Sequence, residues 1–392
     1  QLLSRGPHAW PPRSPRYSGA GADRCAPTAR GSYRAHRGTT SAPASSARSR
    51  GLSSTDSPRL PPDTTNSLAH AALRMSAPWQ MLGTLAQLDV TDPILETRFA
   101  GVTLKSPVGL AAGFDKDCEL IPALSALGFG FLTVGSIMPQ PRPGHAFPRL
   151  VRYADKDSLA DSMGLPSRGL AYAVARLREL DRPAVPLFAN IGGFSPGEIA
   201  DSLFAVEPYV DGIEISLMCP NVLKPGEAFD DVGLLTHILE RTGGRTRPAI
   251  VRVPNDTARS ERLKDLIECC IDGGIDGIKI AGGRPVDEPQ LGAKRGTLHG
   301  AMVFDTALDN LKRAAAIARG RIPIKANGGV RTGHDVLTML RAGATCVDLY
   351  SAFIYRGWSV ARRINLELAA LLREPNTADN AAAAAQTNRA GA

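Results

Sequence analysis

The chain has 392 residues, 43% of them hydrophobic, which is enough for the core of a large soluble domain. Its net charge of +8 comes from the first 60 residues, which hold ten Arg, no Lys and only two acidic groups. The other residues carry 36 basic and 36 acidic groups, so the remaining chain has no charge bias toward nucleic acid, and we expect no nucleic-acid partner.

The six cysteines contain no C-x-x-C pair, and the histidines have no zinc-type spacing. We therefore expect neither a disulfide framework nor a metal site, and a reducing compartment such as the cytoplasm. No apolar run reaches 18 residues, so we expect no membrane-spanning helix.

Two tails are expected to be disordered because they offer too little apolar surface to offset the entropy of ordering. Residues 1–62 are rich in Arg, Ser and Pro, and residues 375–392 are rich in Ala. The Arg- and Ser-rich composition of the first tail is also typical of an organelle transit peptide. Because the chain opens with Gln1, an incomplete or over-extended gene model is an equal alternative.

Residues 63–95 are predicted to form a short helical extension. Asn66 can cap a helix, and Pro78 is expected to divide the segment 66–89 into two helices. One face of this pair would be apolar, consisting of Leu68, Ala72, Met75, Trp79, Leu82 and Leu85. The pair is either a lid packed on the next domain or a peripheral membrane contact that dips into the bilayer surface.

Residues 96–374 alternate short apolar runs with stretches of helical period. The runs cover residues 106–114, 129–137, 185–193, 211–220, 247–254, 276–283, 322–330 and 346–353. Continuous apolar runs indicate strands buried on both faces, as in parallel sheets. Eight such βα units predict an α/β protein with a (β/α)8 TIM barrel, and a doubly wound sheet is the alternative.

Helices are expected between these strands, for example over 257–274 and 333–344, the second ending at Gly343. The active site of a TIM barrel lies where its strands end. Small and polar residues are concentrated at those ends in this chain, which is where we look for chemistry.

The segments 327–333 and 349–353 follow the seventh and eighth strands, where barrels commonly bind phosphate. Gly328, Gly329 and Gly333 would let backbone N–H groups approach an anion. The alternative is that these glycines only make tight turns.

After the first strand, Ala111, Ala112 and Gly113 leave room for a flat ring against the backbone. Lys116 follows them and could hold an anionic group, although it could also be solvated.

Three further polar residues stand in or after strands four and five. Cys219 could act as a base if its pKa is lowered, and Asn221 could orient a substrate, although a single Cys is more often inert. Arg252 lies in an otherwise apolar strand and needs an anionic partner, either a reduced flavin or a structural carboxylate.

Taken together, these segments resemble dihydroorotate dehydrogenases from about residue 66 to 373. The motifs that carry the resemblance are 106-SPVGLAAGFDKD-117, 129-FGFLTVGSIMPQPRPG-144, 219-CPNV-222, 326-ANGGVRTGHDVLTMLRAGA-344 and 349-LYSA-352. The stretch 67-SLAHAALRM-75 resembles the N-terminal helices of the membrane-associated, quinone-using class.

The resemblance implies an FMN site formed by Ala111, Ala112, Gly113, Ser136, Asn190, Arg252, Gly328, Gly329, Tyr350 and Ser351. It places Lys116 and Asn221 against the substrate and Cys219 at the position of the catalytic base. The soluble class has Cys there and the membrane class has Ser. This chain therefore combines a membrane-class N-terminus with a soluble-class base.

The chain departs from the family pattern in the substrate pocket. Asp161 and Ser216 each replace an Asn that touches flavin and orotate, and 281-AGG-283 replaces a run of Thr and Asn. Arg252 replaces a Lys near flavin N1, and Gly296-Thr297 replaces a Gly-Gly pair. These changes should weaken orotate recognition, and Asp161 should repel the orotate carboxylate.

The expected reaction is oxidation of dihydroorotate to orotate, a step of pyrimidine biosynthesis, with hydride transfer to FMN N5 and Cys219 as base. The alternatives are a flavoprotein that acts on another dihydropyrimidine or cyclic amide, and a non-catalytic flavin-binding barrel. The electron acceptor stays open among quinone, fumarate, oxygen and a partner subunit. The oligomeric state is not indicated by the sequence.

Overall fold

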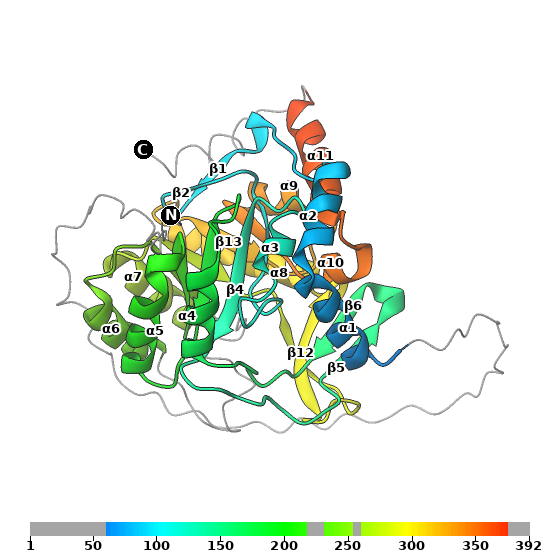
Figure 1. Cartoon of the computed structure of the whole chain (residues 1–392). Coiled ribbons are helices and arrows are strands. Elements are labelled where there is room, and N and C mark those ends of the chain that lie inside the picture. Colours follow the sequence, from blue (N-terminus) through cyan, green and yellow to red (C-terminus); the bar gives the residue numbers. More distant parts are fainter. Residues whose placement is uncertain (1–59, 218–230, 254–259, 375–392) are drawn as a thin grey trace, which may run out of the picture.

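The structure is a computed structural model that describes residues 60–217, 231–253 and 260–374. Eight parallel strands close into a barrel (Figure 1). In order around the barrel they are β3 (Val108–Leu110), β4 (Phe131–Ile137), β7 (Leu187–Ile191), β8 (Gly212–Ser216), β9 (Ala249–Val253), β10 (Gly277–Ile280), β13 (Ile324–Asn327) and β14 (Cys346–Leu349). Each lies inside one of the eight apolar runs, so the predicted (β/α)8 barrel is confirmed.

Helices surround the barrel (Figure 1). They are α3 (Ile121–Leu124), α4 (Leu170–Glu179), α5 (Pro196–Val206), α6 (Asp231–Thr242), α7 (Ser260–Asp272), α8 (Phe304–Ala318), α9 (Gly333–Arg341), α10 (Ser351–Arg356) and α11 (Val360–Arg373). Helices α7 and α9 confirm the two helical stretches expected at 257–274 and 333–344. Gly343 follows α9 with a φ of 107°, a left-handed conformation that suits glycine and helps to end the helix.

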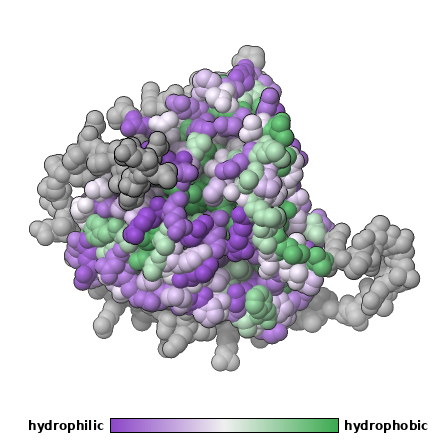
Figure 2. Space-filling view, viewed as in Figure 1, coloured by the Kyte–Doolittle hydropathy of each residue, from purple (hydrophilic) through white to green (hydrophobic). Residues whose placement is uncertain are grey.

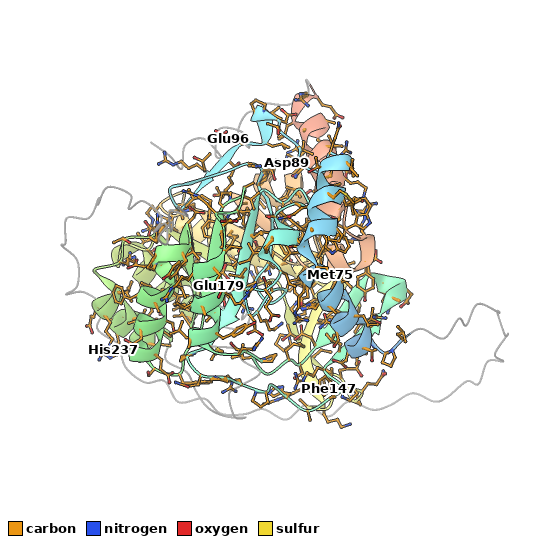
Figure 3. All side chains as sticks on the ribbon, in the orientation of Figure 1. Met75, Asp89, Glu96, Phe147, Glu179 and His237 are labelled. Atoms are coloured by element: carbon orange, nitrogen blue, oxygen red, sulfur yellow. The ribbon has the colours of Figure 1, made fainter. Side chains whose placement is uncertain are left out.

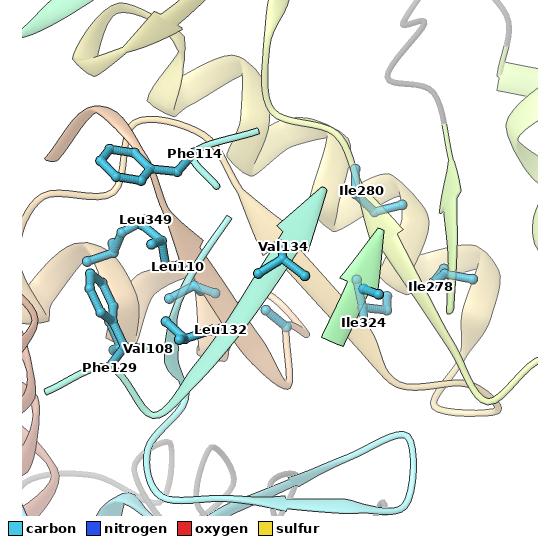
Figure 4. Close-up of a cluster of buried hydrophobic side chains, with 14 of the residues drawn as sticks. Val108, Leu110, Phe114, Phe129, Leu132, Val134, Ile278, Ile280, Ile324 and Leu349 are labelled. Carbon is cyan, nitrogen blue, oxygen red and sulfur yellow. The ribbon is translucent and has the colours of Figure 1, made fainter. Parts of the chain in front are cut away.

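The barrel strands are buried on both faces because helices cover the outside and side chains fill the inside. Figure 4 shows part of this apolar core, with Leu132 and Val134 of β4 near Leu110 of β3. A hairpin of β1 (Thr97–Phe99) and β2 (Val102–Leu104) closes the amino-terminal end of the barrel. There the Phe99 ring packs edge-on against Phe188, with centroids 6.3 Å apart.

A second sheet lies at the opposite, carboxyl-terminal end of the barrel. Its strands are β5 (Leu150–Tyr153), β6 (Ser158–Asp161), β11 (Arg284–Asp287) and β12 (Arg295–Gly300), paired antiparallel in the order β11-β12-β6-β5. The pairs follow β4 and β10 in the chain, so they extend from strand ends where a barrel places its active site. The sequence reading did not anticipate this sheet, which aligns Asp161 of β6 with Thr297 of β12.

Two helices, α1 (Pro62–Arg74) and α2 (Ser76–Leu85), precede the barrel. The expectations for their boundaries were wrong. Helix α1 begins at Pro62 rather than after Asn66, because proline suits the first helical position. The break falls at Met75, and Pro78 lies in the first turn of α2, where a missing N–H costs no helical hydrogen bond.

The two helices pack on the barrel. Leu73 of α1 is buried, and its neighbour His70 places its ring 5.2 Å from that of Phe114. Gly83 lets α2 approach the backbone of Ala126, whose carbonyl oxygen would be 2.3 Å from a Cβ at that position. None of the helices in the described ranges is long and apolar enough to span a bilayer.

Candidate active site

Backbone hydrogen bonds join the segment after β3 to its two neighbours in the barrel, β14 and β4. Ala111 N–H donates to the Leu349 carbonyl over 2.9 Å, and Gly113 N–H donates to the Gly135 carbonyl over 2.6 Å. Gly135 has a φ of 95°, and a Cβ there would lie 2.1 Å from the Asn190 carbonyl oxygen. The small residues 111–113 and Ser136 therefore border a site with little room for side chains.

Gly328 and Gly329, after β13, have φ values of 121° and 71°. A Cβ on Gly328 would lie 2.9 Å from the Cα of Gly282, and a Cβ on Gly282 would lie 2.0 Å from the Asn327 carbonyl oxygen. Close packing of the ends of β10 and β13 thus requires glycine on both sides. A side chain at position 282 is excluded for this steric reason.

The expectation for Gly333 was wrong. Its N–H donates to Glu367 Oε2 over 2.8 Å, and Thr332 and Asp335 form a capping box at the start of α9. Because these carboxylates already occupy the helix N-terminus, an anion would meet Gly328, Gly329 and the start of α10 instead.

Tyr350 and Ser351 lie at the start of α10, after β14. The Tyr350 ring lies 6.1 Å from the rings of both Phe114 and His299, which connects the end of the barrel to the second sheet. Burial raises the pKa of the Tyr350 hydroxyl, and the charge of Asp161 adds to this effect.

Lys116 reaches the same region from the segment after β3, and its Nζ donates to the Gly113 carbonyl. Asp115 holds this segment in place by accepting N–H groups of Glu119 and Leu120 over 2.9 and 2.8 Å. Burial lowers the pKa of Lys116, and nearby carboxylates, that of Asp161 first, oppose the shift.

Asp161 is paired with a residue that the sequence reading missed. Oδ2 of Asp161 lies 2.9 Å from Nε2 of His299, which stands on the adjacent strand β12. Burial alone would raise the pKa of Asp161, but His299 and Lys116 outweigh it, so the net shift is downward. The expectation that Asp161 repels the orotate carboxylate did not take this pairing into account.

A second charged cluster fills the barrel interior below these strand ends. Lys325 Nζ lies 2.5 Å from Glu214 Oε2, and Lys279 Nζ lies 3.1 Å from Glu214 Oε1 and 2.7 Å from Asp348 Oδ2. Burial opposes the ionisation of Glu214, but Lys279 and then Lys325 outweigh it and lower the pKa of Glu214. The sequence reading missed this cluster, although a Lys within an apolar strand signals a buried anionic partner.

Arg252 on β9 lies beside this cluster. It is aligned with Ser216 on β8 and with Lys279 on β10. Its charge contributes to lowering the pKa of Glu214, so Arg252 has a structural anion nearby as well as the site above. Both anionic partners considered for Arg252, a reduced flavin and a structural carboxylate, are thus compatible with its position.

Cys219 and Asn221 lie outside the described residues. Ser216, the last residue of β8, is buried.

The described residues fit a planar, polar ring at the strand ends. Among them, Asn190 Oδ1 and Asn327 Oδ1 are buried acceptors without a hydrogen-bond partner. Unpartnered buried polar atoms in a native protein call for an explanation, and a ligand with N–H groups would supply partners.

A closed parallel barrel with glycine-rich strand ends, a buried lysine and unpartnered amides defines a TIM-barrel enzyme with its site at the carboxyl ends of the strands. The family model for dihydroorotate dehydrogenase matches residues 94–372. The chain belongs to the dihydroorotate dehydrogenase family, whose members are flavin-dependent oxidoreductases acting on a CH–CH group.

Relatives named dihydroorotate dehydrogenase (quinone) are similar along most of their length. The relative from Halobacterium salinarum is 33% identical over 80% of this chain and 92% of its own. The one from Methylococcus capsulatus is also 33% identical, over 80% of this chain and 96% of its own.

Two solved structures of DHODH from Eimeria tenella share the fold. The complex with ferulenol has a TM-score of 0.70 at 24% identity and covers 83% of this chain and 95% of its own. The ligand-free form has a TM-score of 0.63 at 26% identity and covers 76% of this chain and 94% of its own.

Proposed function

We propose that this protein binds FMN at the carboxyl ends of the barrel strands and oxidises dihydroorotate to orotate. The observation that carries the proposal is the meeting of small backbone segments, Lys116 and two unpartnered amide oxygens at these strand ends. Family membership gives the reaction class, and the quinone-dependent relatives support dihydroorotate as substrate.

The residues divide into a ring site and a phosphate site. Residues 111–113, Ser136 and Asn190 would border the isoalloxazine ring, and Arg252 would lie near its N1. The phosphate would bind Gly328, Gly329, and the backbone at Tyr350 and Ser351. When bound, FMN would supply the acceptor for a hydride from the substrate.

Substrate binding is assigned to Lys116 and Asn221, with Asp161 and Ser216 at the pocket edge. The ammonium of Lys116 would bind a carboxylate, and its partly buried position strengthens that contact by limiting access of water. We assign to Cys219 the removal of a proton from the substrate carbon next to the one that loses hydride.

A quinone is the proposed electron acceptor. An apolar cavity of about 320 Å³ lies between the N-terminal helices and the barrel. Its lining includes Ala72 and Trp79 from the helices, and Tyr350 and Phe114 from the strand ends. Tyr350 therefore borders both this cavity and the proposed flavin site, so a quinone bound in the cavity would be close enough to accept electrons from the flavin.

We further propose that the helical pair rests on a membrane surface. Figure 2 shows apolar residues along the edge where Figure 1 places α1 and α2. Leu68 and Leu85 are 55% and 75% exposed, and Met75, labelled in Figure 3 where the two helices meet, is 62% exposed. Exposed apolar side chains on the helices that cover an apolar cavity suit a bilayer that contains the acceptor.

The test is an anaerobic titration of the purified protein. FMN should copurify at about one per chain, and dihydroorotate should bleach its absorbance. Adding quinone, fumarate or oxygen in turn should then identify the acceptor by the rate of reoxidation. Protein that folds but cannot be loaded with FMN would exclude the proposal.

A different dihydropyrimidine or cyclic amide is the second candidate substrate. It is favoured by the altered pocket, where Gly282 and Gly283 replace polar side chains and Asp161 replaces an amide. Bleaching by such a compound, but not by dihydroorotate, would select this alternative. No bleaching by any of them would favour a non-catalytic flavin-binding barrel.

A further inference from the structure

Three departures of the pocket from the family pattern lie around His299. Asp161 accepts a hydrogen bond from His299, and Gly283 lies against both His299 and Thr297. A Cβ on Gly283 would lie 2.5 Å from Cγ2 of Thr297, 2.8 Å from Cε1 of His299 and 3.1 Å from its Nδ1. Since distances below 3.0 Å are closer than real Cβ contacts, the imidazole and the Thr297 methyl together occupy the space that a side chain at position 283 would need.

The geometry also places a proton on Nε2 of His299. An aspartate carboxylate only accepts hydrogen bonds, so the proton of the Asp161–His299 contact is on Nε2. The edge of the ring with Nδ1 and Cε1 is turned toward Gly283. The side chains of His299 and Asp161 remain 26% and 17% exposed, so the pair borders an open pocket rather than the sealed core.

The third member of this arrangement is Lys116, whose charge interacts with that of Asp161. If His299 were absent, Asp161 would be left with Lys116 as its cationic neighbour in this pocket. The pair would then be neutral, and little positive charge would remain for an anionic substrate. His299 forms a hydrogen bond with the Asp161 carboxylate and so weakens the interaction between Asp161 and Lys116.

We propose that His299 is a specificity-determining residue that, by pairing with Asp161, keeps Lys116 available for a substrate carboxylate. Gly283 is part of the same arrangement, because a glycine at this position leaves room for the imidazole. This inference rests on the proposed function and refines it: the pocket selects anionic over neutral dihydropyrimidines in spite of Asp161.

The test is a double-mutant cycle on the FMN-loaded protein with His299→Ala, Asp161→Asn and the double variant. Equilibrium binding of orotate is measured from the change in flavin absorbance, and uracil serves as the neutral ligand. His299→Ala should weaken orotate binding about tenfold, since a charge-assisted contact at a partly exposed site is lost. In the Asp161→Asn background the same change should have little effect, and uracil binding should change little in any variant.

Gly283→Ala tests the steric part without removing the imidazole. The added methyl should displace Thr297 and His299 and weaken orotate binding in the same direction as His299→Ala. Gly244→Ala is the matched control because no atom lies within 4 Å of its Cβ position. His334→Ala, at an exposed position on α9, is the control for loss of a histidine.

Equal effects of His299→Ala with and without Asp161, or equal effects on orotate and uracil, would overturn the inference. His299→Gln guards against misfolding, because its amide can still donate to Asp161 and should restore part of the orotate affinity. If the parent protein is bleached by dihydroorotate but the cycle shows no coupling, only this inference fails. If the parent neither binds orotate nor is bleached, the proposed function fails and the inference with it.

Discussion

Asn190 donates a hydrogen bond from Nδ2 to Glu214 Oε1 over 2.8 Å, and both side chains are fully buried within the barrel. The carboxylate fixes the amide orientation, so Asn190 Oδ1 is the atom left for a ligand. The negative charge of the Glu214 carboxylate is balanced by Lys279 and Lys325. The floor of the proposed flavin site thus depends on a buried ionic cluster.

Glu214→Gln should destabilise the protein by about 3–5 kcal/mol, because it leaves Lys279 and Lys325 short of a buried counter-charge. Urea denaturation of the FMN-free protein measures this difference. Glu240→Gln on the exposed side of α6 is the control and should change the free energy of unfolding by less than about 0.5 kcal/mol. A small effect of Glu214→Gln would mean that the cluster relaxes or admits water.

The same cluster predicts a pH dependence of stability. The folded-state pKa of Glu214 lies below its ordinary value of 4.5. A group with a depressed pKa stabilises the fold fully above its unfolded pKa and loses this contribution as the pH falls through its folded pKa. The stability difference between the parent and Glu214→Gln should therefore be constant from pH 7 to about pH 5 and shrink below pH 4.5. A difference that grows toward acid would contradict this assignment.

Arg252→Met should lower the reduction potential of the bound flavin, because a positive charge that would stabilise the reduced anion is removed. A shift of about 30 mV corresponds to about 1.4 kcal/mol for a two-electron couple, which is a reasonable scale for one partly buried charge. The potential can be measured by equilibration with a redox dye. Arg252→Lys keeps the charge and should stay near the parent, whereas an unshifted Arg252→Met would return Arg252 to a purely structural role.

Ala72→Phe should fill part of the apolar cavity beneath α1 and raise the KM for quinone at least several-fold. The rate at which dihydroorotate reduces the flavin should not change, because Lys116, Asp161 and Ser216 do not line this cavity. Ala71→Phe, one residue away on the exposed face, is the matched control. Equal quinone kinetics in both variants would show that the acceptor binds elsewhere.

Cys219→Ala should retain FMN and lose roughly 10²–10⁴-fold in the rate of flavin reduction, the usual scale for a positioned base. A thiol with a pKa near about 8.5 is mostly protonated at neutral pH, so the parent rate should rise with pH and then level off. Cys219→Ser should keep partial activity with its profile shifted to higher pH, since a hydroxyl is the weaker acid. Stopped-flow absorbance measures these rates, and an unimpaired Cys219→Ala variant would mean that another group is the base.

The sequence by itself determined the barrel and the end of it that carries the site. Continuous apolar runs indicate strands buried on both faces, and each of the eight contains one strand of the closed barrel. Lys116, Asn190, Gly328 and Tyr350 could be placed at one end of the barrel from the sequence, because parallel strands bring all their carboxyl ends to one side.

Only the tertiary structure decided how the charged side chains are paired. His299 and Asp161 are far apart in sequence and meet because β12 and β6 are neighbours in a sheet that no periodicity had indicated. Lys279 and Lys325 stand in apolar runs, a pattern that indicates a buried anionic partner but not which one, and their carboxylate partners come from other strands of the closed barrel. Ion pairing depends on distances of a few ångströms across the fold, and local sequence patterns carry no information about such distances.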